Sequence, residues 1–143
     1  MGEIIRNKGA QIWSVAPETT VFDAIALMAD KNVGALLVLS GNRLIGIISE
    51  RDYTRKVVLK GRVSKQTSVQ EIVSTPVISA TPRHTVTDCM KLMTENRVRH
   101  LPVLDGDVVV GVVSIGDLVN WIISAQSSTI HQLENFISGG YPG

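Results

Sequence analysis

The chain has 143 residues, 44% hydrophobic and 19% charged, which is typical of one globular domain and excludes disorder over most of its length. Its 14 Lys and Arg residues nearly balance 13 Asp and Glu residues, so no general electrostatic attraction to nucleic acid or to an anionic membrane is expected. No apolar run approaches the roughly 20 residues of a membrane-spanning helix, and no targeting leader is visible. These features predict a cytoplasmic protein without a membrane segment, and a processed organellar protein would have the same features.

The sequence repeats itself. A shift of 65 residues aligns 14–58 with 79–123 without a gap, and 15 of the 45 aligned positions are identical. Composition alone would give about a fifth of that number. One structural unit is therefore predicted to occur twice. We expect repeat 1 with an N-terminal segment over 1–65, repeat 2 over 66–126, and a C-terminal helix and tail over 127–143.

Each repeat begins with a predicted helix. Thr20 and Thr85 stand three residues before an aspartate, which is the capping-box pattern of a helix N-terminus. Apolar residues then recur at i, i+4 and i+7, the spacing of one buried helical stripe. Helices are therefore predicted over 21–32 and 86–97, each preceded by a short strand.

A hairpin and a second helix follow in each repeat. Runs rich in Val, Ile and Leu flank a polar turn with a glycine, which predicts strand pairs. The predicted strands are 33–39 with 44–48, and 98–104 with 108–113. Ser49-x-x-Asp52 and Ser114-x-x-Asp117 then repeat the capping-box spacing. The unit is therefore β-α-β-β-α.

The predicted fold is an α+β pair of repeats with pseudo-two-fold symmetry, its sheets packed through their helices around a cleft. A unit of about 50 residues buries too little surface to be stable alone, so the second copy is expected to complete it. Ser68-x-x-Glu71 predicts a short helix in the linker, residues 60–78. A last apolar stripe predicts a helix that packs on this module or on a second subunit, and its residues are Ile130, Leu133, Phe136 and Ile137.

The strand-to-helix junctions are the most informative chemical feature. The pattern apolar-Gly-apolar-apolar-Ser-x-x-Asp ends at Asp52 and again at Asp117. A strand that enters a helix directly leaves unpaired N–H groups at the helix start, where anions such as phosphate bind. The aspartate could accept hydrogen bonds from ribose hydroxyls and the serine could donate one to phosphate. Capping alone is an equally complete explanation, because Thr20-x-x-Asp23 has the same spacing without any ligand argument.

Two basic features lie near these junctions. Arg99 and His100 in the second repeat replace Gly34 and Ala35 in the first, and strand alternation would place them on opposite faces. The segment 51–65 contains six Lys and Arg residues against one acid, and a solvated helix face is its simplest interpretation. Two of these cations lie on the first turns of the second helix, close enough to reach a bound phosphate, namely Arg55 and Lys56.

Other chemistry is poorly supported. The three histidines and the single cysteine have no metal-ligand spacing. Cys89 aligns with Ala24 beside an apolar stripe, which favours a small buried thiol over a nucleophile. The sequence contains no phosphate-binding glycine loop and no nucleophile elbow, so an enzyme and a catalytic cofactor are not predicted.

The duplicated Gly-apolar-apolar-Ser-x-x-Asp pattern and the Arg-His-Leu-Pro-Val segment resemble the cystathionine-β-synthase (CBS) domain family, and the tandem arrangement resembles a CBS pair, or Bateman module. The similarity covers about residues 10–125, and 48–61 with the Gly-Gly-Tyr near the C-terminus resemble small stand-alone two-CBS proteins. The resemblance implies that AMP, ATP, NAD or S-adenosylmethionine binds in the inter-repeat cleft. It also implies a flat dimer.

Carried onto this chain, the resemblance implies roles for particular residues. The two junction aspartates would bind ribose, the junction serines would lie beside phosphate or ribose, and Arg99 and His100 would contact phosphate. The segments before Pro17 and Pro82 would face adenine through backbone and apolar contacts. The basic residues 51, 55 and 56 would compensate for the missing Arg-His pair at Gly34 and Ala35. The candidate ligand-binding residues are Ser49, Arg51, Asp52, Arg55, Lys56, Ala80, Thr81, Pro82, Arg99, His100, Leu101, Pro102, Ser114 and Asp117.

Three hypotheses remain. The first is a non-catalytic energy sensor that binds an adenine nucleotide and acts, as a homodimer, through a separate effector protein. The second is a structural dimerisation or interaction module with vestigial sites. The third is a nucleotide hydrolase, which the absence of a paired base and nucleophile disfavours.

Overall fold

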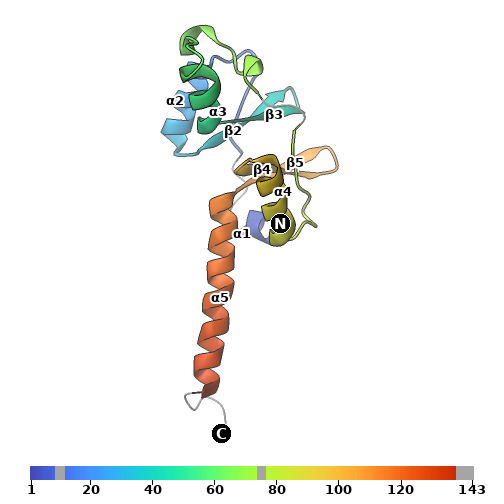
Figure 1. Ribbon diagram of the computed structural model, residues 1–143. Helices are drawn as coiled ribbons and strands as arrows, with labels where there is room; N and C mark the ends of the chain where they lie inside the picture. The colour runs from blue at the N-terminus through green and yellow to red at the C-terminus, as the bar shows by residue number, and fades with distance from the viewer. Residues whose placement is uncertain (9–11, 74–76, 138–143) are drawn as a thin grey trace.

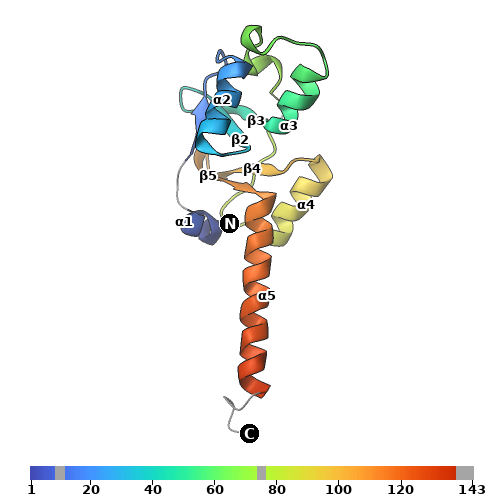
Figure 2. The same cartoon turned by 90° about the vertical axis from the view of Figure 1, so that its left-hand side faces the viewer.

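The computed structural model describes residues 1–8, 12–73 and 77–137, with side chains described in 1–6, 12–73 and 77–126. Two α/β units are stacked one above the other, and a long C-terminal helix extends away from the second (Figures 1 and 2). The predicted α+β class and the tandem arrangement are confirmed.

The first repeat follows the predicted element order. Its sheet has the order β1-β2-β3, with β1 parallel to β2 and β2 antiparallel to β3. The helix after this sheet is α-helical for four residues only and continues as a π-helical turn over Thr54–Val58, which the sequence did not predict. The elements are β1 (Ser14–Val15), α2 (Val21–Lys31), β2 (Ala35–Ser40), β3 (Arg43–Ser49) and α3 (Glu50–Tyr53).

The second repeat copies the first with one reduction. The predicted strand before its first helix consists of a single parallel bridge between Ala80 and Val103. The hairpin has the same register as in the first repeat, including a shift at the same place along the strand. The elements are α4 (Val86–Asn96), β4 (His100–Asp105), β5 (Val108–Ser114) and α5 (Ile115–Ile137).

The same local devices begin and end the equivalent helices. The Thr20 side chain accepts a hydrogen bond from the Asp23 N–H, and Thr85 and Asp88 cap each other reciprocally. Both helices end in a left-handed residue, Asn32 or Arg97, each with φ of 54°. A left-handed residue ends the helical hydrogen bonding and redirects the chain into the next strand. The boundaries predicted from caps and stripes are therefore correct to within one residue at each end.

Each repeat has its own hydrophobic core between its helices and one face of its hairpin. In the first core Met28 and Ile48 are almost completely buried, and in the second Leu101 and Val113 are. The helices lie on the outer sides of the stack and the two sheets lie toward its middle (Figures 1 and 2). The expectation that the sheets pack through their helices is wrong, because each helix uses its apolar stripe on its own hairpin.

The two repeats exchange short segments. Helix α1 (Gly2–Lys8) precedes the first repeat in sequence, yet Ile4 and Ile5 are buried in the core of the second. The linker precedes the second repeat, yet Val69 and Ile72 are buried in the core of the first. Main-chain hydrogen bonds fasten the linker there, including Val21 N–H to the Thr67 carbonyl at 2.8 Å. Each core is therefore completed by a segment that lies beyond the sequence of its own repeat: α1 completes the second core and the linker completes the first.

A glycine makes the docking of α1 possible. A Cβ placed on Gly111 of β5 would lie 2.5 Å from Cδ1 of Ile5 and 3.1 Å from its Cγ2. The Ile5 side chain therefore rests directly on the strand backbone. A glycine within a strand often marks such a close approach.

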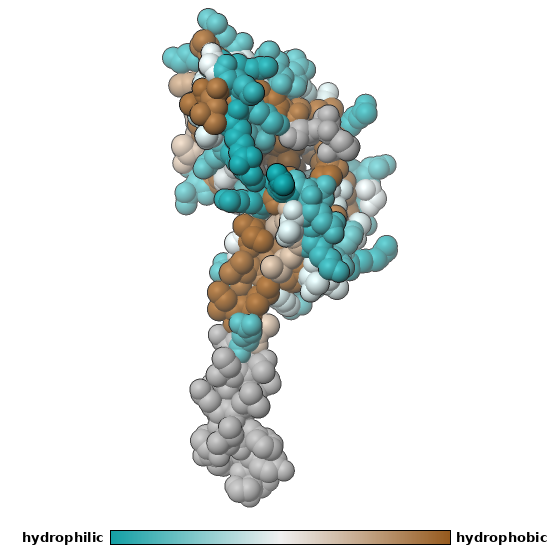
Figure 3. All heavy atoms as spheres, viewed as in Figure 1, coloured by the Kyte–Doolittle hydropathy of each residue, from teal (hydrophilic) through white to brown (hydrophobic). Residues whose placement is uncertain are grey.

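The predicted linker helix exists, as a 3₁₀ helix over Val69–Glu71 with a reciprocal Ser68–Glu71 capping box. The predicted C-terminal helix also exists, as the continuation of α5, but the side chains of its stripe beyond Gln126 and the Gly-Gly-Tyr segment lie outside the described part. Near the body, Val119 is 41% exposed and Ile123 is 54% exposed. Figure 3 shows apolar surface along this first part of α5. No helix within the described ranges is both long and apolar enough to cross a membrane.

Candidate ligand site between the repeats

Both strand-to-helix junctions form the caps that their spacing predicts. Asp52 Oδ2 accepts hydrogen bonds from the Ser49 N–H at 2.9 Å and from the Ser49 hydroxyl at 3.0 Å, and Ser49 Oγ accepts from the Asp52 N–H at 3.2 Å. In the second repeat Asp117 Oδ2 accepts from the Ser114 N–H at 2.8 Å, and Ser114 Oγ accepts from the Asp117 N–H at 3.1 Å. The capping interpretation is therefore confirmed, and the cap of Asp52 uses one of its carboxylate oxygens, Oδ2.

The other oxygen of Asp52 faces a cation. Lys56 Nζ lies 3.4 Å from Asp52 Oδ1, one helical turn further along, and the same amine donates to the Ile72 carbonyl at 2.9 Å. The Asp52 side chain is 19% exposed and that of Lys56 is 38% exposed. A carboxylate and an amine are thus held together at one partly covered position, and Lys56 ties the first junction to the linker.

The repeats meet close to this junction. Arg51 Nη1 donates to the carbonyl of Arg97 at 3.0 Å, which joins the first repeat to the end of α4 in the second. A Cβ on Gly34 would lie 3.4 Å from Nε2 of His100, so the imidazole of the second repeat packs on a glycine of the first. The imidazole therefore lies at the boundary between the repeats, within ordinary contact distance of position 34.

Arg99 and His100 differ in exposure, as strand alternation predicted. His100 begins β4 and is half-buried against the first repeat, whereas Arg99 is exposed just before the strand. The Arg99 carbonyl accepts from the Ile115 N–H at 2.9 Å, and the strand register shifts only after Val103, so no bulge before Pro102 brings the two side chains together. The structure therefore places the His100 side chain at the inter-repeat boundary, and a phosphate contact by Arg99 stays a prediction.

Several predicted site residues belong to the core or to the α1 docking region. Leu101 is 0% exposed, Ala80 is 1% exposed and Pro102 is buried, so their side chains offer no surface to a ligand. The main chain of Ala80 also has both of its hydrogen bonds made, from its N–H to the Pro102 carbonyl and from the Leu104 N–H to its carbonyl. A ligand contact at these three residues would have to come from the main chain, and their role in binding stays a prediction. The Thr81 N–H donates to Nδ1 of His84 at 2.8 Å, and the Pro82 carbonyl accepts from Gly2 N–H at 3.2 Å.

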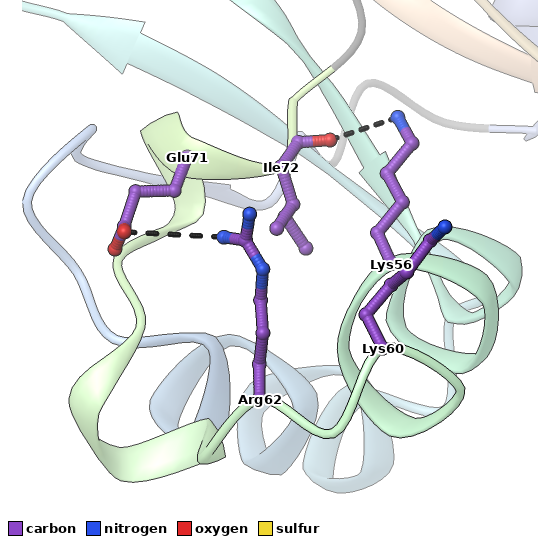
Figure 4. A pocket seen from close by; sticks show the side chains of 5 residues that line it. All are labelled: Lys56, Lys60, Arg62, Glu71 and Ile72. Atoms are coloured by element: carbon purple, nitrogen blue, oxygen red, sulfur yellow. Dashed lines mark hydrogen bonds and ion pairs between the residues drawn. The ribbon is translucent and has the colours of Figure 1, made fainter.

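A cavity of about 480 Å³ adjoins the first junction (Figure 4). Lys56 lines it from the helix, Lys60 and Arg62 line it from the turn that follows, and Glu71 Oε1 lies 3.9 Å from Arg62 Nη1. Sequence reasoning assigned Lys60 and Arg62 to a solvated face and overlooked them as site residues. The excess of cations over 51–65 was the available signal, but its spacing did not show that three of them surround one cavity. Arg55 is exposed and does not line it.

Glu71 holds its charge beside these cations. The Ser68 N–H and hydroxyl donate to its carboxylate and hold the pKa of Glu71 below its ordinary value, with Arg62 contributing in the same direction. The hydrogen bonds from Ser68 keep the Glu71 carboxylate at the linker. A movement of the Arg62 side chain toward a ligand would therefore separate it from Glu71.

A second cavity, of about 470 Å³, lies where α1 meets the start of α4, and Trp121 and His84 are among its lining residues. No group of three or more His, Cys, Asp or Glu residues suited to a metal ion occurs among the described residues. Cys89 is fully buried in the second core, and burial raises the pKa of its thiol. The interpretation of Cys89 as a structural thiol is confirmed.

Comparison with known proteins identifies the repeats. The sequence model of the CBS domain matches residues 3–59 and again residues 69–124. CBSX3, a mitochondrial CBS domain-containing protein of Arabidopsis thaliana, is 41% identical over 151 aligned residues that cover 99% of this chain and 73% of that protein.

Solved structures give the same result. A protein with CBS domains from Burkholderia ambifaria has a TM-score of 0.84 at 48% identity and covers 88% of this chain and 95% of its own. A hexameric CBS-CP12 protein from bloom-forming cyanobacteria has a TM-score of 0.73 at 28% identity and covers 82% of this chain and 68% of its own. Both halves of the sequence, and nearly its whole length, thus have counterparts of the same architecture.

Proposed function

The chain belongs to the CBS domain family as a tandem pair, and on that premise we propose that it is a non-catalytic regulatory module that binds an adenosine-containing ligand between its repeats. AMP, ATP and NAD are the candidates. The proposal assigns the ribose to Asp52 and Asp117, and a phosphate to Lys56 and to the boundary formed by Arg51 and His100.

The surroundings of Asp52 carry this proposal. The cap uses only Oδ2, whereas Oδ1 faces an amine at 3.4 Å beside an open cavity. A carboxylate oxygen can accept from ribose hydroxyls, and a neighbouring amine can donate to phosphate. The Arg51–Arg97 hydrogen bond joins the first repeat to the second next to Asp52. Ligand binding at Asp52 can therefore change the position of one repeat relative to the other.

The rival is a structural module whose aspartates only cap helices. Asp88 offers a matched control, because it caps Thr85 with nearly the same geometry, 2.9 Å and 3.1 Å, away from the inter-repeat boundary. Each of the three substitutions Asp52→Asn, Asp117→Asn and Asp88→Asn removes the negative charge of a carboxylate in the first turn of a helix and should weaken that helix start.

The experiment is isothermal titration of wild-type protein and the three variants with AMP, ATP and NAD, together with urea denaturation. The proposal expects nucleotide affinity to fall at least tenfold in the Asp52 or Asp117 variant and to be unchanged in the Asp88 variant, while all three lose similar stability. Equal affinity in all four proteins, or no binding of any of these nucleotides by the wild type, would reject the sensor in favour of the structural module.

The output is proposed to pass through assembly. A homodimer, formed in part by the exposed apolar side of α5 around Val119 and Ile123, would act on a separate effector protein. The hexameric state named for the cyanobacterial CBS-CP12 protein is a precedent for assembly in the family. The cytoplasmic location stays a prediction, since the Arabidopsis relative is named as mitochondrial.

A further inference from the structure

We propose that the basic cavity beside the first junction receives a chain of two or more phosphates, so that the first-repeat site is selective for adenosine di- or triphosphate over the monophosphate. This inference rests on the proposed adenosine site and names its ligand class. The cavity is lined by Lys56, Lys60, Arg62, Glu71 and Ile72, and it bears three cations against one carboxylate (Figure 4).

The local backbone brings the three cations together. The π-helical turn Thr54–Val58 carries Lys56, and Lys60 lies in the turn that follows it, where both side chains line the same cavity. Gly61 then has φ of +69°, a conformation that suits glycine, and the Arg62 N–H bonds back to the Val57 carbonyl at 3.0 Å. Figure 4 shows the Arg62 side chain between Glu71, to which its guanidinium is joined, and the two lysines.

Lys56 links the cavity to the proposed ribose position. Its amine lies 3.4 Å from Asp52 Oδ1, and its side chain is one of those that line the cavity. A phosphate chain that leaves a ribose bound at Asp52 therefore meets Lys56 first and Lys60 and Arg62 beyond it. A monophosphate ends at the first amine, whereas a di- or triphosphate engages all three cations.

The carboxylate in the cavity does not cancel this attraction. Glu71 is anchored to the linker cap at 2.6 Å from the Ser68 N–H, and its ion pair with Arg62 is long, at 3.9 Å, and exposed. Exposed ion pairs contribute little free energy, whereas a guanidinium binds phosphate through paired, charge-assisted hydrogen bonds. Arg62 can therefore exchange Glu71 for a phosphate at small cost.

The second repeat serves as an internal comparison. The 65-residue shift that matches Asp52 with Asp117 matches Lys56 with Trp121, Lys60 with Ala125 and Arg62 with Ser127. None of the three cations has a cationic counterpart. Polyphosphate selectivity is therefore a property of the first repeat alone, and the two sites of the pair differ in ligand class.

The test is titration calorimetry at fixed ionic strength with adenosine, AMP, ADP, ATP and inorganic tripolyphosphate. The proteins are the wild type, the double variant Lys60→Gln/Arg62→Gln, and the control Lys65→Gln. Lys65 belongs to the same basic segment, but its amine lies over the Phe22 ring, 4.8 Å from the centroid, and it does not line the cavity. All substituted side chains are exposed, so the variants are expected to fold.

The expected result is that wild-type protein binds ATP about tenfold or more tightly than AMP. The double variant should bind ATP no better than AMP, with AMP affinity unchanged, and the control should match the wild type. Equal wild-type affinity for AMP and ATP, or an ATP affinity that the double variant retains, overturns the inference while the adenosine site stands.

If no adenosine compound binds, the proposed function fails. The titration with tripolyphosphate then tests by itself whether the cavity binds a phosphate chain. Binding of tripolyphosphate that the double variant loses would support a phosphate-chain site, and no binding would overturn it as well.

Discussion

His100 of the second repeat lies against Gly34 of the first, so close that a Cβ on residue 34 would be 3.4 Å from its Nε2. The sequence repeat pairs Gly34 with Arg99 and Ala35 with His100. The two repeats thus carry side chains of very different size at equivalent positions, and the boundary between them is asymmetric in sequence.

This contact predicts a graded response at position 34. Gly34→Ala should change the free energy of unfolding by less than about 0.5 kcal/mol, because 3.4 Å is near ordinary van der Waals contact. Gly34→Leu should displace the imidazole and destabilise by about 1–3 kcal/mol. Urea denaturation with the His100 ring resonances followed by NMR measures both effects. An unshifted His100 resonance in the leucine variant would show that the ring does not pack there.

The close approach of Ile5 to Gly111 predicts strong coupling. Gly111→Ala should destabilise the protein by about 1–3 kcal/mol, because its Cβ would overlap the Ile5 side chain at 2.5 Å. Ile5→Ala removes the overlapping atoms but also buried apolar surface. In a double-mutant cycle the two losses should sum to clearly more than the loss of the double variant. Simple additivity would mean that α1 is not seated on β5.

The Asp88 cap predicts a dependence of stability on pH. Hydrogen bonds from the Thr85 N–H and hydroxyl hold the pKa of Asp88 below its ordinary value. Its contribution is therefore fully present above the unfolded-state pKa and is lost as the pH falls through the lower folded-state pKa. Asp88→Asn should remove this part of the acid destabilisation. Urea titrations between neutral pH and pH about 3 test it, and parallel pH profiles for the two proteins would contradict it.

The buried thiol of Cys89 predicts slow chemical modification. Burial raises the thiol pKa and covers the sulfur, so a thiol reagent at neutral pH should react only when the second core opens. The labelling rate should rise steeply with urea and approach that of a model thiol in the unfolded protein. Cys89→Ala, which copies Ala24 of the first repeat, should cost only about 1 kcal/mol. Rapid labelling of the native protein would refute this assignment.

The sequence predicts the local structure of both repeats well. Caps at Thr20 and Thr85 and the apolar stripes after them give α2 and α4, and the glycine turns give the hairpins. These signals succeed because the residues that determine a helix end or a tight turn lie within a few positions of it.

Features that depend on distant contacts were not predictable. Nothing in the spacing of Ile4 and Ile5 indicates that they belong to the second core, and the same is true of Val69 and Ile72 in the first. The basic cavity was missed for a similar reason, because the turn at Gly61 decides where Arg62 lies. The caps at Asp52 and Asp117 were predicted, but their spacing does not separate capping from binding.

Because the repeats exchange short segments, the two halves of the sequence do not coincide with the two folded units of the structure. A fragment that ends before the linker would carry α1 without the core that receives it and would lack Val69 and Ile72 for its own. A fragment that begins at the linker would have the converse defect. Each fragment alone should be unfolded or prone to aggregation, and a mixture of the two should fold into a complex. The intact chain should unfold in a single thermal transition.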